Sequence, residues 1–336
     1  MFNFLSKLFT NIGVDLGTAN TIVFVHGKGF VVNEPSVIAY KNRNDIIAVG
    51  KDAKEMLGKT HRGITVVRPL ADGVIADFIA GEEMIRSFIR LAEIPRFFIN
   101  KIIVGVPTGV TSVEKRAVME SAESAGARQV YLISEPMAAA IGVGINVMGS
   151  NACMIVDIGG GTTDIAVINY GGIVIDNTIR VAGDEMNDAL IRYVKNTYSL
   201  RIGEATAEKL KIEYGAVGEY AEIEFAIKGL DAQSGLPRQE EVSTVIFEEA
   251  LKDVLNTIIN SILLTLDKLP PELAADVIDR GIILTGGGAL LRGLDVYLRD
   301  IVNLPVSRAN NALYCVAEGT RKILENFEYF KPVLFN

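Results

Sequence analysis

The chain has 336 residues, of which 49% are hydrophobic, and a formal net charge of −8 at pH 7. It is long enough for two compact domains with their own cores, and its acidity argues against broad nonspecific nucleic-acid binding. Its two histidines and two cysteines are too few for a histidine-based zinc site, a Ser-His-Asp triad or a disulfide framework, so we expect Cys153 and Cys315 to be buried thiols.

The first ten residues show an apolar periodicity typical of a short helix. At about 100° per residue, the apolar side chains lie on one side of that helix and the polar ones on the other. The apolar side comprises Phe2, Phe4, Leu5, Leu8 and Phe9. Such a helix suits a membrane interface, and it suits docking on the protein itself equally well. The segment lacks the long apolar core of a signal peptide, and no apolar run in the chain is long enough to span a bilayer.

Strands and helices alternate along the rest of the chain. Apolar, β-branched runs bounded by glycine or proline predict strands at 12–25, 29–40, 101–107, 152–170 and 281–285. Helical periodicity predicts helices at 80–91, 111–125, 135–143, 184–198, 205–214, 246–266 and 290–301. Thr111 and Glu114 form a capping-box pattern at the start of one of them. This alternation argues for an α/β architecture.

One turn occurs twice, at 14–23 and at 156–165. Each copy runs from an apolar strand through an aspartate and a small-residue turn into a second apolar strand, and Asp15 matches Asp157 at an offset of 142 residues (157 − 15). Glycine lets such a turn bring backbone N–H groups close to an anion, and threonine hydroxyls add donors. The aspartates suit a hydrated Mg²⁺ ion. The residues expected at the phosphates are Gly17, Thr18, Ala19, Asn20, Gly159, Gly160, Gly161 and Thr162.

A third glycine turn follows the strand predicted at 281–285. It comprises Thr285, Gly286, Gly287, Gly288 and Ala289, and it leads into the helix predicted at 290–301. A helix N-terminus without side chains can lie against a nucleoside or a phosphate. A single Asp-x-Gly hairpin would most simply be an ordinary turn. Two copies followed by this third turn indicate instead a polyphosphate and its metal clamped from both sides.

Together, the three turns resemble those of the actin, sugar-kinase and heat-shock-chaperone ATPase superfamily. Closer matches extend along the chain, at 12–21, 33–37, 68–77, 135–142, 157–164, 182–186, 206–213 and 270–273. On these stretches, which run from about residue 12 to the C-terminal region, the chain is identified as a member of the MreB family of bacterial actin homologues.

The resemblance implies an α/β, actin-like two-lobed ATPase fold, with a duplicated ribonuclease-H-like core and two inserted small subdomains. The expected first lobe comprises 12–150 and 315–336, with its small subdomain at about 39–70. The expected second lobe comprises 151–314, with its small subdomain at about 188–243. Residues 1–11 would form the amphipathic N-terminal segment.

The resemblance also implies ATP or ADP and Mg²⁺ as cofactors, the metal held by Asp15 and Asp157 partly through water. The helix predicted at 205–214 would flank the adenosine. Glu208 and Lys211 share one face of that helix, where they would otherwise form a simple surface ion pair. The residues expected at the nucleoside are Gly183, Glu208, Lys209, Leu210 and Lys211.

A catalytic role is expected for Glu135, which stands where an apolar stretch meets a predicted helix. It resembles the residue that orients the attacking water in this superfamily, although an acid there would also be favourable simply as a helix N-terminal residue. The residue before it is often acidic in the family and is Ser134 here. Asp164 and Thr163 match positions near that water, and Asp77 is expected to orient another water from the opposite side.

The stretch 94–99 contains two adjacent phenylalanines, Phe97 and Phe98, beside a proline and between Arg96 and Lys101. By resemblance this is a membrane-insertion loop; alternatively, both phenylalanines are core residues at the start of the next strand. The family further implies head-to-tail filaments of this protein on the inner face of the cytoplasmic membrane. Membrane proteins of the cell-wall elongation machinery are expected as partners, and nucleic acid is not.

Three functions are open on such a fold. The first is a filament-forming ATPase that organises cell-wall synthesis and cell shape. The second is a small-molecule kinase, which needs a substrate cleft and a base that the sequence does not identify, and fold alone does not decide the matter. The third is a chaperone-type ATPase, for which we would expect a peptide-binding domain after the nucleotide-binding lobes. We favour the first.

Overall fold

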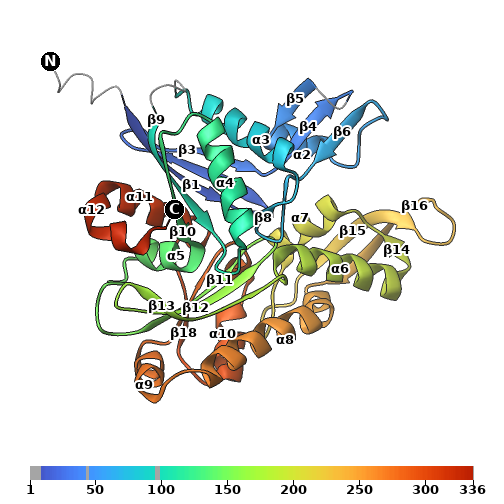
Figure 1. Cartoon of the computed structure of the whole chain (residues 1–336). Helices are drawn as coiled ribbons and strands as arrows, with labels where there is room; N and C mark the ends of the chain where they lie inside the picture. Colours follow the sequence, from blue (N-terminus) through green and yellow to red (C-terminus); the bar gives the residue numbers. More distant parts are fainter. Residues whose placement is uncertain (1–8, 43–44, 95–98, 336) are drawn as a thin grey trace.

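The computed structural model describes residues 9–42, 45–94 and 99–335. The predicted membrane residues Phe2, Phe4, Leu5, Leu8, Phe97 and Phe98 lie outside the described residues. Two five-stranded sheets make up the centre of the molecule, and helices cover their faces (Figure 1). We call each large sheet a lobe, together with the small sheet that extends from it and the helices that pack on these two sheets.

The two large sheets repeat one topology. Their strand orders are β10-β9-β1-β2-β3 and β18-β17-β11-β12-β13. In each, the first strand of a hairpin is central, antiparallel to its hairpin partner on one side and parallel to a later strand on the other. The strands of the first sheet are β1 (Thr10–Leu16), β2 (Asn20–Val25), β3 (Gly29–Pro35), β9 (Ile99–Val106) and β10 (Gln129–Ser134). Those of the second are β11 (Cys153–Ile158), β12 (Thr163–Asn169), β13 (Gly172–Ile179), β17 (Ile282–Thr285) and β18 (Val306–Arg308).

Two helices fill the space between the sheets. α11 (Cys315–Glu325) packs on β1, β2 and β9, and α5 (Glu135–Val143) packs on β11 and β12. The two helices also pack on each other, and they approach closely because each has a glycine at the contact. A Cβ on Gly142 would lie 1.9 Å from the Cys315 oxygen, and a Cβ on Gly319 would lie 1.9 Å from the Ala138 oxygen. The sheets are therefore joined through a helix pair that tolerates no side chain at its crossing.

The outer helices cover the opposite faces of the sheets (Figure 1). α3 (Phe78–Leu91) and α4 (Ser112–Ser124) pack together on the first sheet. α8 (Val245–Asp267) packs over the second, where α9 (Pro271–Arg280) and α10 (Leu294–Val302) also lie, and α6 (Gly183–Tyr198) packs on α8. The short elements near the C-terminus are η4 (Ala312–Tyr314), α12 (Phe327–Phe330) and η5 (Lys331–Val333).

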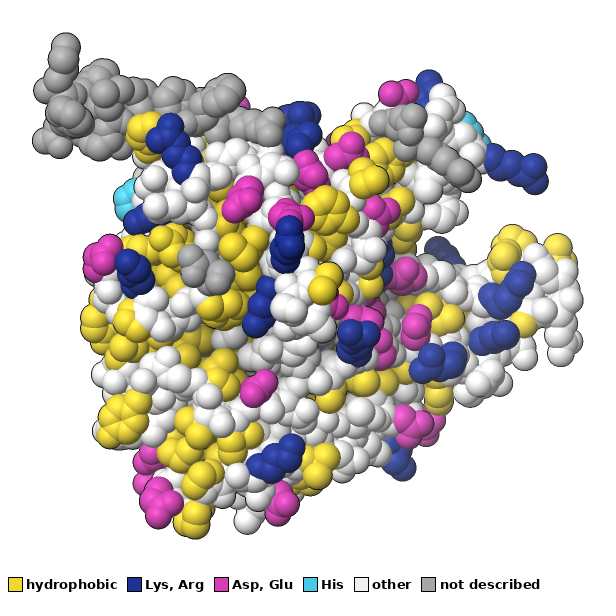
Figure 2. Space-filling view, in the orientation of Figure 1, with side chains coloured by type: hydrophobic (Ala, Val, Ile, Leu, Met, Phe, Trp, Pro, Cys, Tyr) yellow, Lys and Arg dark blue, Asp and Glu magenta, His cyan; other side chains and the backbone are white. Residues whose placement is uncertain are grey.

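A small sheet extends from each lobe, and the two face each other across a notch (Figures 1 and 2). In the first lobe, β4 (Ile38–Lys41), β5 (Asp45–Val49) and β6 (Ile64–Val67) pack with α2 (Lys51–Met56). In the second, β14 (Leu200–Arg201), β15 (Glu224–Asp231) and β16 (Pro237–Ser243) form the sheet beside α7 (Glu204–Tyr214). A separate two-stranded hairpin, β7 (Leu70–Ala71) and β8 (Val74–Ile75), lies in the first lobe.

The predicted α/β architecture is confirmed, and most predicted helices lie close to their observed positions. The capping box at α4 is present, since the Thr111 hydroxyl accepts from the Glu114 N–H and the Glu114 carboxylate accepts from the Thr111 N–H. The helix predicted at 290–301 is wrong at its start. α10 begins at Leu294, because η3 (Gly288–Leu290) is a 3₁₀ turn and Gly293 has a φ of 77°.

Thr10, which was predicted to belong to the N-terminal helix, instead begins β1. Cys153 and Cys315 are buried free thiols, as predicted. No helix in the described part of the chain is both long and apolar enough to cross a membrane.

Candidate functional site

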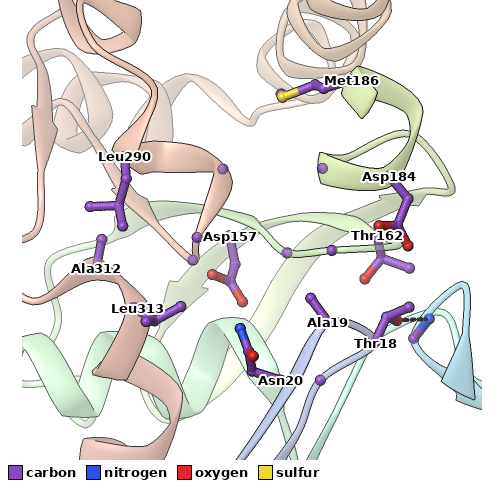
Figure 3. Close-up of a pocket in the computed structure, with 18 of the residues that line it drawn as sticks. Thr18, Ala19, Asn20, Asp157, Thr162, Asp184, Met186, Leu290, Ala312 and Leu313 are labelled. Carbon is purple, nitrogen blue, oxygen red and sulfur yellow. Dashed lines mark hydrogen bonds between the residues drawn. The ribbon is translucent and has the colours of Figure 1, made fainter. Parts of the chain in front are cut away.

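A cavity of about 400 Å³ lies between the lobes (Figure 3). Its wall is built from both aspartate hairpins, the third glycine turn and the facing sides of α6 and α7. Thr18 and Thr162 lie at one end of the view and Leu290 and Leu313 at the other, so the cavity has a hydroxyl-rich end and an apolar end. Its volume lies within the usual range for cofactor sites.

The tips of the two hairpins touch each other across this cavity. A Cβ on Gly160 would lie 2.8 Å from the Cβ of Ala19, so only glycine allows the contact. The second turn is closed by the Gly159 N–H, which donates to the Thr162 oxygen at 2.8 Å. In the first turn, the Thr18 hydroxyl accepts from the Gly73 N–H at 2.9 Å, the dashed bond in Figure 3. The sequence repeat therefore corresponds to two facing turns in space.

Of the acids that line the cavity wall, Asp15, Asp157 and Glu135 have raised pKa values. Burial raises the pKa of Asp15 to about 8, and the charge of Asp157 adds to the rise. Burial raises the pKa of Asp157 to about 7, while a 2.8 Å hydrogen bond from the Thr285 hydroxyl opposes the rise. Burial raises the pKa of Glu135 well above its ordinary value, and the charges of Asp164, Asp157 and Asp15 add to it. A divalent cation bound beside these acids would favour their charged forms and lower their pKa values.

The donor set fits Mg²⁺ bound together with a polyphosphate. Within residues 9–42, 45–94 and 99–335, no group of three or more His, Cys, Asp and Glu side chains is arranged to hold a metal by itself. Mg²⁺ commonly takes one or two carboxylates and completes its shell with phosphate oxygens and water. Asp15 and Asp157, one from each hairpin, are placed for that role.

The remaining predicted catalytic residues do not line the cavity. Asp164 is buried behind the wall, cross-strand from Asp157. The Thr163 hydroxyl donates to the Val181 oxygen at 2.7 Å, so it points away from the cavity. Asp77 caps α3 by accepting from the Ala80 N–H at 3.0 Å. Of the four predicted catalytic residues, only Glu135 lies on the wall.

Beside Gly183, α7 presents Glu208, Lys211 and Ile212 to the cavity. The shared face predicted for Glu208 and Lys211 is thus observed, whereas Lys209 is exposed and Leu210 is buried in the core. The Lys211 ammonium donates to the Gly183 oxygen at 2.5 Å, and burial lowers its pKa to about 8. The other predicted contacts on the wall are Gly17, Ala19, Asn20, Gly159, Gly183, Gly286, Gly287 and Gly288; Gly161, Thr285 and Ala289 lie just behind it.

Charged side chains join the two lobes at the inner end of the notch (Figure 2). The Lys54 ammonium lies 2.7 Å from a Glu208 carboxylate oxygen. Arg68 pairs with Glu204 and, at 3.4 Å, with Asp184. No local sequence pattern predicts these pairs, because their members lie more than a hundred residues apart.

Apolar residues and threonines were also missed at the sequence level. Met186, Leu290, Leu291 and Leu313 form part of the wall, but apolar residues of this kind look like ordinary core in a sequence. Thr108, which follows β9, and Thr178, which lies on β13, both donate a hydrogen bond to Asp164. No motif brings those two threonines together.

Comparisons with known proteins identify the family. The family model described as MreB/Mbl protein matches residues 9–332. The cell shape-determining protein MreB of Escherichia coli (strain K12) is 44% identical over 338 residues, covering 98% of this chain and 97% of that protein. The cell shape-determining protein Mbl of Bacillus subtilis (strain 168) is 46% identical over 321 residues, covering 95% and 96%.

Solved structures agree with these relatives. The crystal structure of MreB5 of Spiroplasma citri bound to AMPPNP matches with a TM-score of 0.91 and 38% identity, covering 96% of this chain and 97% of that one. A MamK double helical filament shares the fold, with a TM-score of 0.81 and 24% identity over 94% of this chain and 98% of that one. The chain has an actin-like fold and belongs to the MreB/Mbl protein family.

Proposed function

We propose that this protein binds ATP with Mg²⁺ between its lobes, hydrolyses it, and assembles into filaments that organise cell-wall synthesis and cell shape. The observation that carries this proposal is the pair of touching hairpins, which brings Asp15 and Asp157 to one cavity. Nucleotide binding is supported by the related MreB5, whose structures were solved with AMPPNP and with ADP.

Each end of the cavity suits one part of the nucleotide. Backbone N–H groups of the two turns, with the hydroxyls of Thr18 and Thr162, suit the phosphates. Glu208 and Lys211 suit the ribose, and the glycine turn beside Leu290 suits the base. Bound Mg²⁺ would neutralise charge on the phosphates, and Asp15 and Asp157 would hold it.

Glu135 is the best-placed residue for the hydrolytic step. It is 8% exposed, lies on the cavity wall and begins α5, which packs against the second sheet. A carboxylate beside a bound water can orient that water and accept its proton. We assign Glu135 the task of holding the attacking water, and we assign Asp164 a position behind it.

Assembly follows from family membership. The relatives of this chain are named for determining cell shape, and head-to-tail contacts propagate into filaments because they do not close. Nucleotide held by both lobes would favour one lobe angle and so couple binding to assembly. The kinase alternative is not favoured, since the whole chain matches the MreB/Mbl family.

We further propose that the filaments lie on the inner face of the cytoplasmic membrane. Their partners there are membrane proteins of the elongation machinery. One observation supports the membrane surface: the strands β1 and β9 begin side by side, since Thr10 pairs with Ile99. Phe9 directly precedes β1, and the Arg128 guanidinium lies 4.2 Å from its ring centre. A cation and apolar residues at one place suit an anionic bilayer surface.

Electron microscopy and phosphate release test the main proposal. With Mg-ATP, the purified protein should form filaments and release phosphate into solution. Without a divalent cation it should do neither. Monomers alone at high concentration with Mg-ATP and liposomes would contradict the assembly proposal, and phosphate transfer to an added sugar would favour the kinase.

Liposome co-sedimentation tests the membrane surface. A Phe97→Ser/Phe98→Ser variant lacking residues 1–9 should polymerise and stay in the supernatant. Each buried apolar side chain contributes roughly 1.5–3 kcal/mol at most, so the parent should pellet only when filaments repeat the contact. A variant that polymerises and still pellets like the parent would refute the proposal.

A further inference from the structure

Asp164 lies behind the cavity wall, and the hydrogen bonds to its carboxylate are concentrated on one of the two oxygens. It is 1% exposed, on β12, and its Oδ1 atom accepts three hydrogen bonds. Two come from Thr108, from its N–H at 2.9 Å and its hydroxyl at 3.0 Å, and one comes from the Thr178 hydroxyl at 2.7 Å. All three donors therefore converge on a single oxygen.

The two threonines come from different lobes. Thr108 follows β9 of the first sheet, and Thr178 lies on β13 of the second. Their hydroxyl oxygens lie 2.7 Å apart, and the Thr178 hydroxyl also accepts from the Gly109 N–H at 3.1 Å. The Asp164 carboxylate thus accepts hydrogen bonds from both lobes. A change in the angle between the lobes would therefore change these hydrogen bonds.

The second oxygen of Asp164 has the opposite character. Oδ2 is buried and has no hydrogen-bond partner among the described residues. A buried carboxylate oxygen without a partner is costly, and such groups commonly meet an ordered water or a ligand. Glu135 is close enough for the charge of Asp164 to be the main influence on its pKa after burial.

We infer that Thr108 and Thr178 are positioning residues, which fix Asp164 so that its second oxygen accepts a hydrogen bond from a water beside Glu135. The pair thereby acts on the rate of ATP hydrolysis and leaves nucleotide affinity nearly unchanged. This inference rests on the proposed ATPase function. It assigns the two threonines a role distinct from the phosphate contacts, because neither lines the cavity.

Steady-state ATPase kinetics of the full chain with Mg-ATP test the inference. Thr178→Val keeps the shape of the side chain and removes the hydroxyl, so kcat should fall about tenfold, as expected for a misplaced catalytic group. KM for Mg-ATP should stay within about twofold, since binding contacts are intact. Thr178→Ser restores the hydroxyl and should restore most of the parent kcat. Thr65→Val, an exposed threonine on strand β6, is the matched control and should behave as the parent.

Each other outcome overturns the inference. A parent-like kcat for Thr178→Val shows that the hydroxyl does not matter. A serine variant as slow as the valine variant shows that packing, and not the hydroxyl, is responsible. A raised KM with an unchanged kcat places the pair in nucleotide binding. If Thr178→Val does not fold, Thr108→Val takes its place, because it keeps the backbone donor and loses only the hydroxyl.

The proposed function can fail separately. A parent that binds Mg-AMPPNP by calorimetry but hydrolyses no ATP refutes the ATPase, and this inference falls with it. A parent that hydrolyses ATP while both threonine variants match it refutes the inference alone.

Discussion

The hairpins β1–β2 and β11–β12 have the same place in their sheets but differ in the residue opposite the aspartate. Asp15 lies opposite Ile22 in the first hairpin, and Asp157 lies opposite Asp164 in the second. Ile22 is 1% exposed and takes an apolar place in the wall. Each hairpin thus contributes a turn and an aspartate to its side of the cavity. Only the second hairpin has an additional carboxylate beside Glu135.

The two turns are also braced by different parts of the molecule. The first is held by the residue after β3, since the Ser36 hydroxyl donates to the Gly17 oxygen at 2.6 Å and the Ser36 N–H donates to the Ala19 oxygen at 3.0 Å. The second is held by the start of α6, where the Asp184 N–H donates to the Gly160 oxygen at 2.7 Å. A shift of α6 would therefore reach the second turn before the first.

The largest expected effect is a loss of Mg-ATP affinity, and it should differ between the aspartates of the two hairpins. Asp157→Ala should weaken Mg-ATP binding by roughly 100-fold, the upper range for lost metal support. Asp15→Ala should weaken it less, because Asp157 also accepts the hydrogen bond from Thr285 that anchors the third glycine turn. Calorimetric titration with Mg-ATP measures both. A larger loss for Asp15→Ala would assign the main metal contact to the first hairpin.

The next largest effect tests whether ATP hydrolysis depends on the carboxylates near the second hairpin. Glu135→Gln should keep Mg-ATP binding and slow phosphate release by about 100-fold, a typical loss for a residue that acts in proton transfer. Glu55→Gln, an exposed glutamate on α2, is the control. Phosphate release at saturating Mg-ATP is the measurement. Release at the parent rate from Glu135→Gln would remove Glu135 from the reaction.

The parts of this comparison that sequence predicted are the local ones. Glycine and aspartate in a turn carry their chemistry within a few residues, so both hairpins and the third glycine turn were predicted. The shared face of Glu208 and Lys211 followed from helical spacing. Strand alternation also predicts that Thr163 faces away from Thr162 and Asp164.

The parts that sequence did not predict depend on the relation between distant strands. Thr108 and Thr178 meet only because β9 and β13 end at the same boundary, and Lys54 meets Glu208 only across the notch. The start of α10 was misplaced because Gly293, in a left-handed conformation, interrupts an otherwise helical pattern. α11 was not predicted either, although it packs against both α5 and the first sheet.

Stability against pH tests the acids that the two hairpins share. The pKa values of Asp15 and Asp157 are raised in the folded protein to about 8 and about 7. A carboxyl with a raised pKa stabilises the fold fully below its unfolded pKa, and this stability is lost as the pH rises through the folded value.

Without nucleotide or divalent cation, the melting temperature should therefore be lower at pH 8.5 than at pH 6.5, by roughly 5 °C for a protein of this size. Mg-ATP should reverse the trend, because it stabilises the charged carboxylates. Asp15→Asn should flatten the dependence. A melting temperature that rises with pH in the absence of Mg-ATP would contradict the assignment.

The smallest expected effect concerns the ion pair that closes the notch. Lys54 on the first lobe pairs with Glu208, which lines the cavity from the second, so removing Lys54 should loosen the contact between lobes near the nucleoside. The Lys54 side chain is 32% exposed, and solvent limits such pairs to roughly 0.2–1 kcal/mol. Lys54→Ala should therefore speed release of a fluorescent nucleotide about two- to fivefold, as measured by stopped flow.

Lys51 provides the matched control for this change. It lies on the same helix, and its partner Glu34, at 3.8 Å, belongs to the same lobe. Lys51→Ala removes an equal charge without touching the contact between lobes, so its release rate should equal that of the parent. The difference between the two variants should shrink at high salt, because screening weakens partly exposed pairs. Equal acceleration by both variants would mean that net charge controls release, and the second lobe would then hold its nucleotide without help from Lys54.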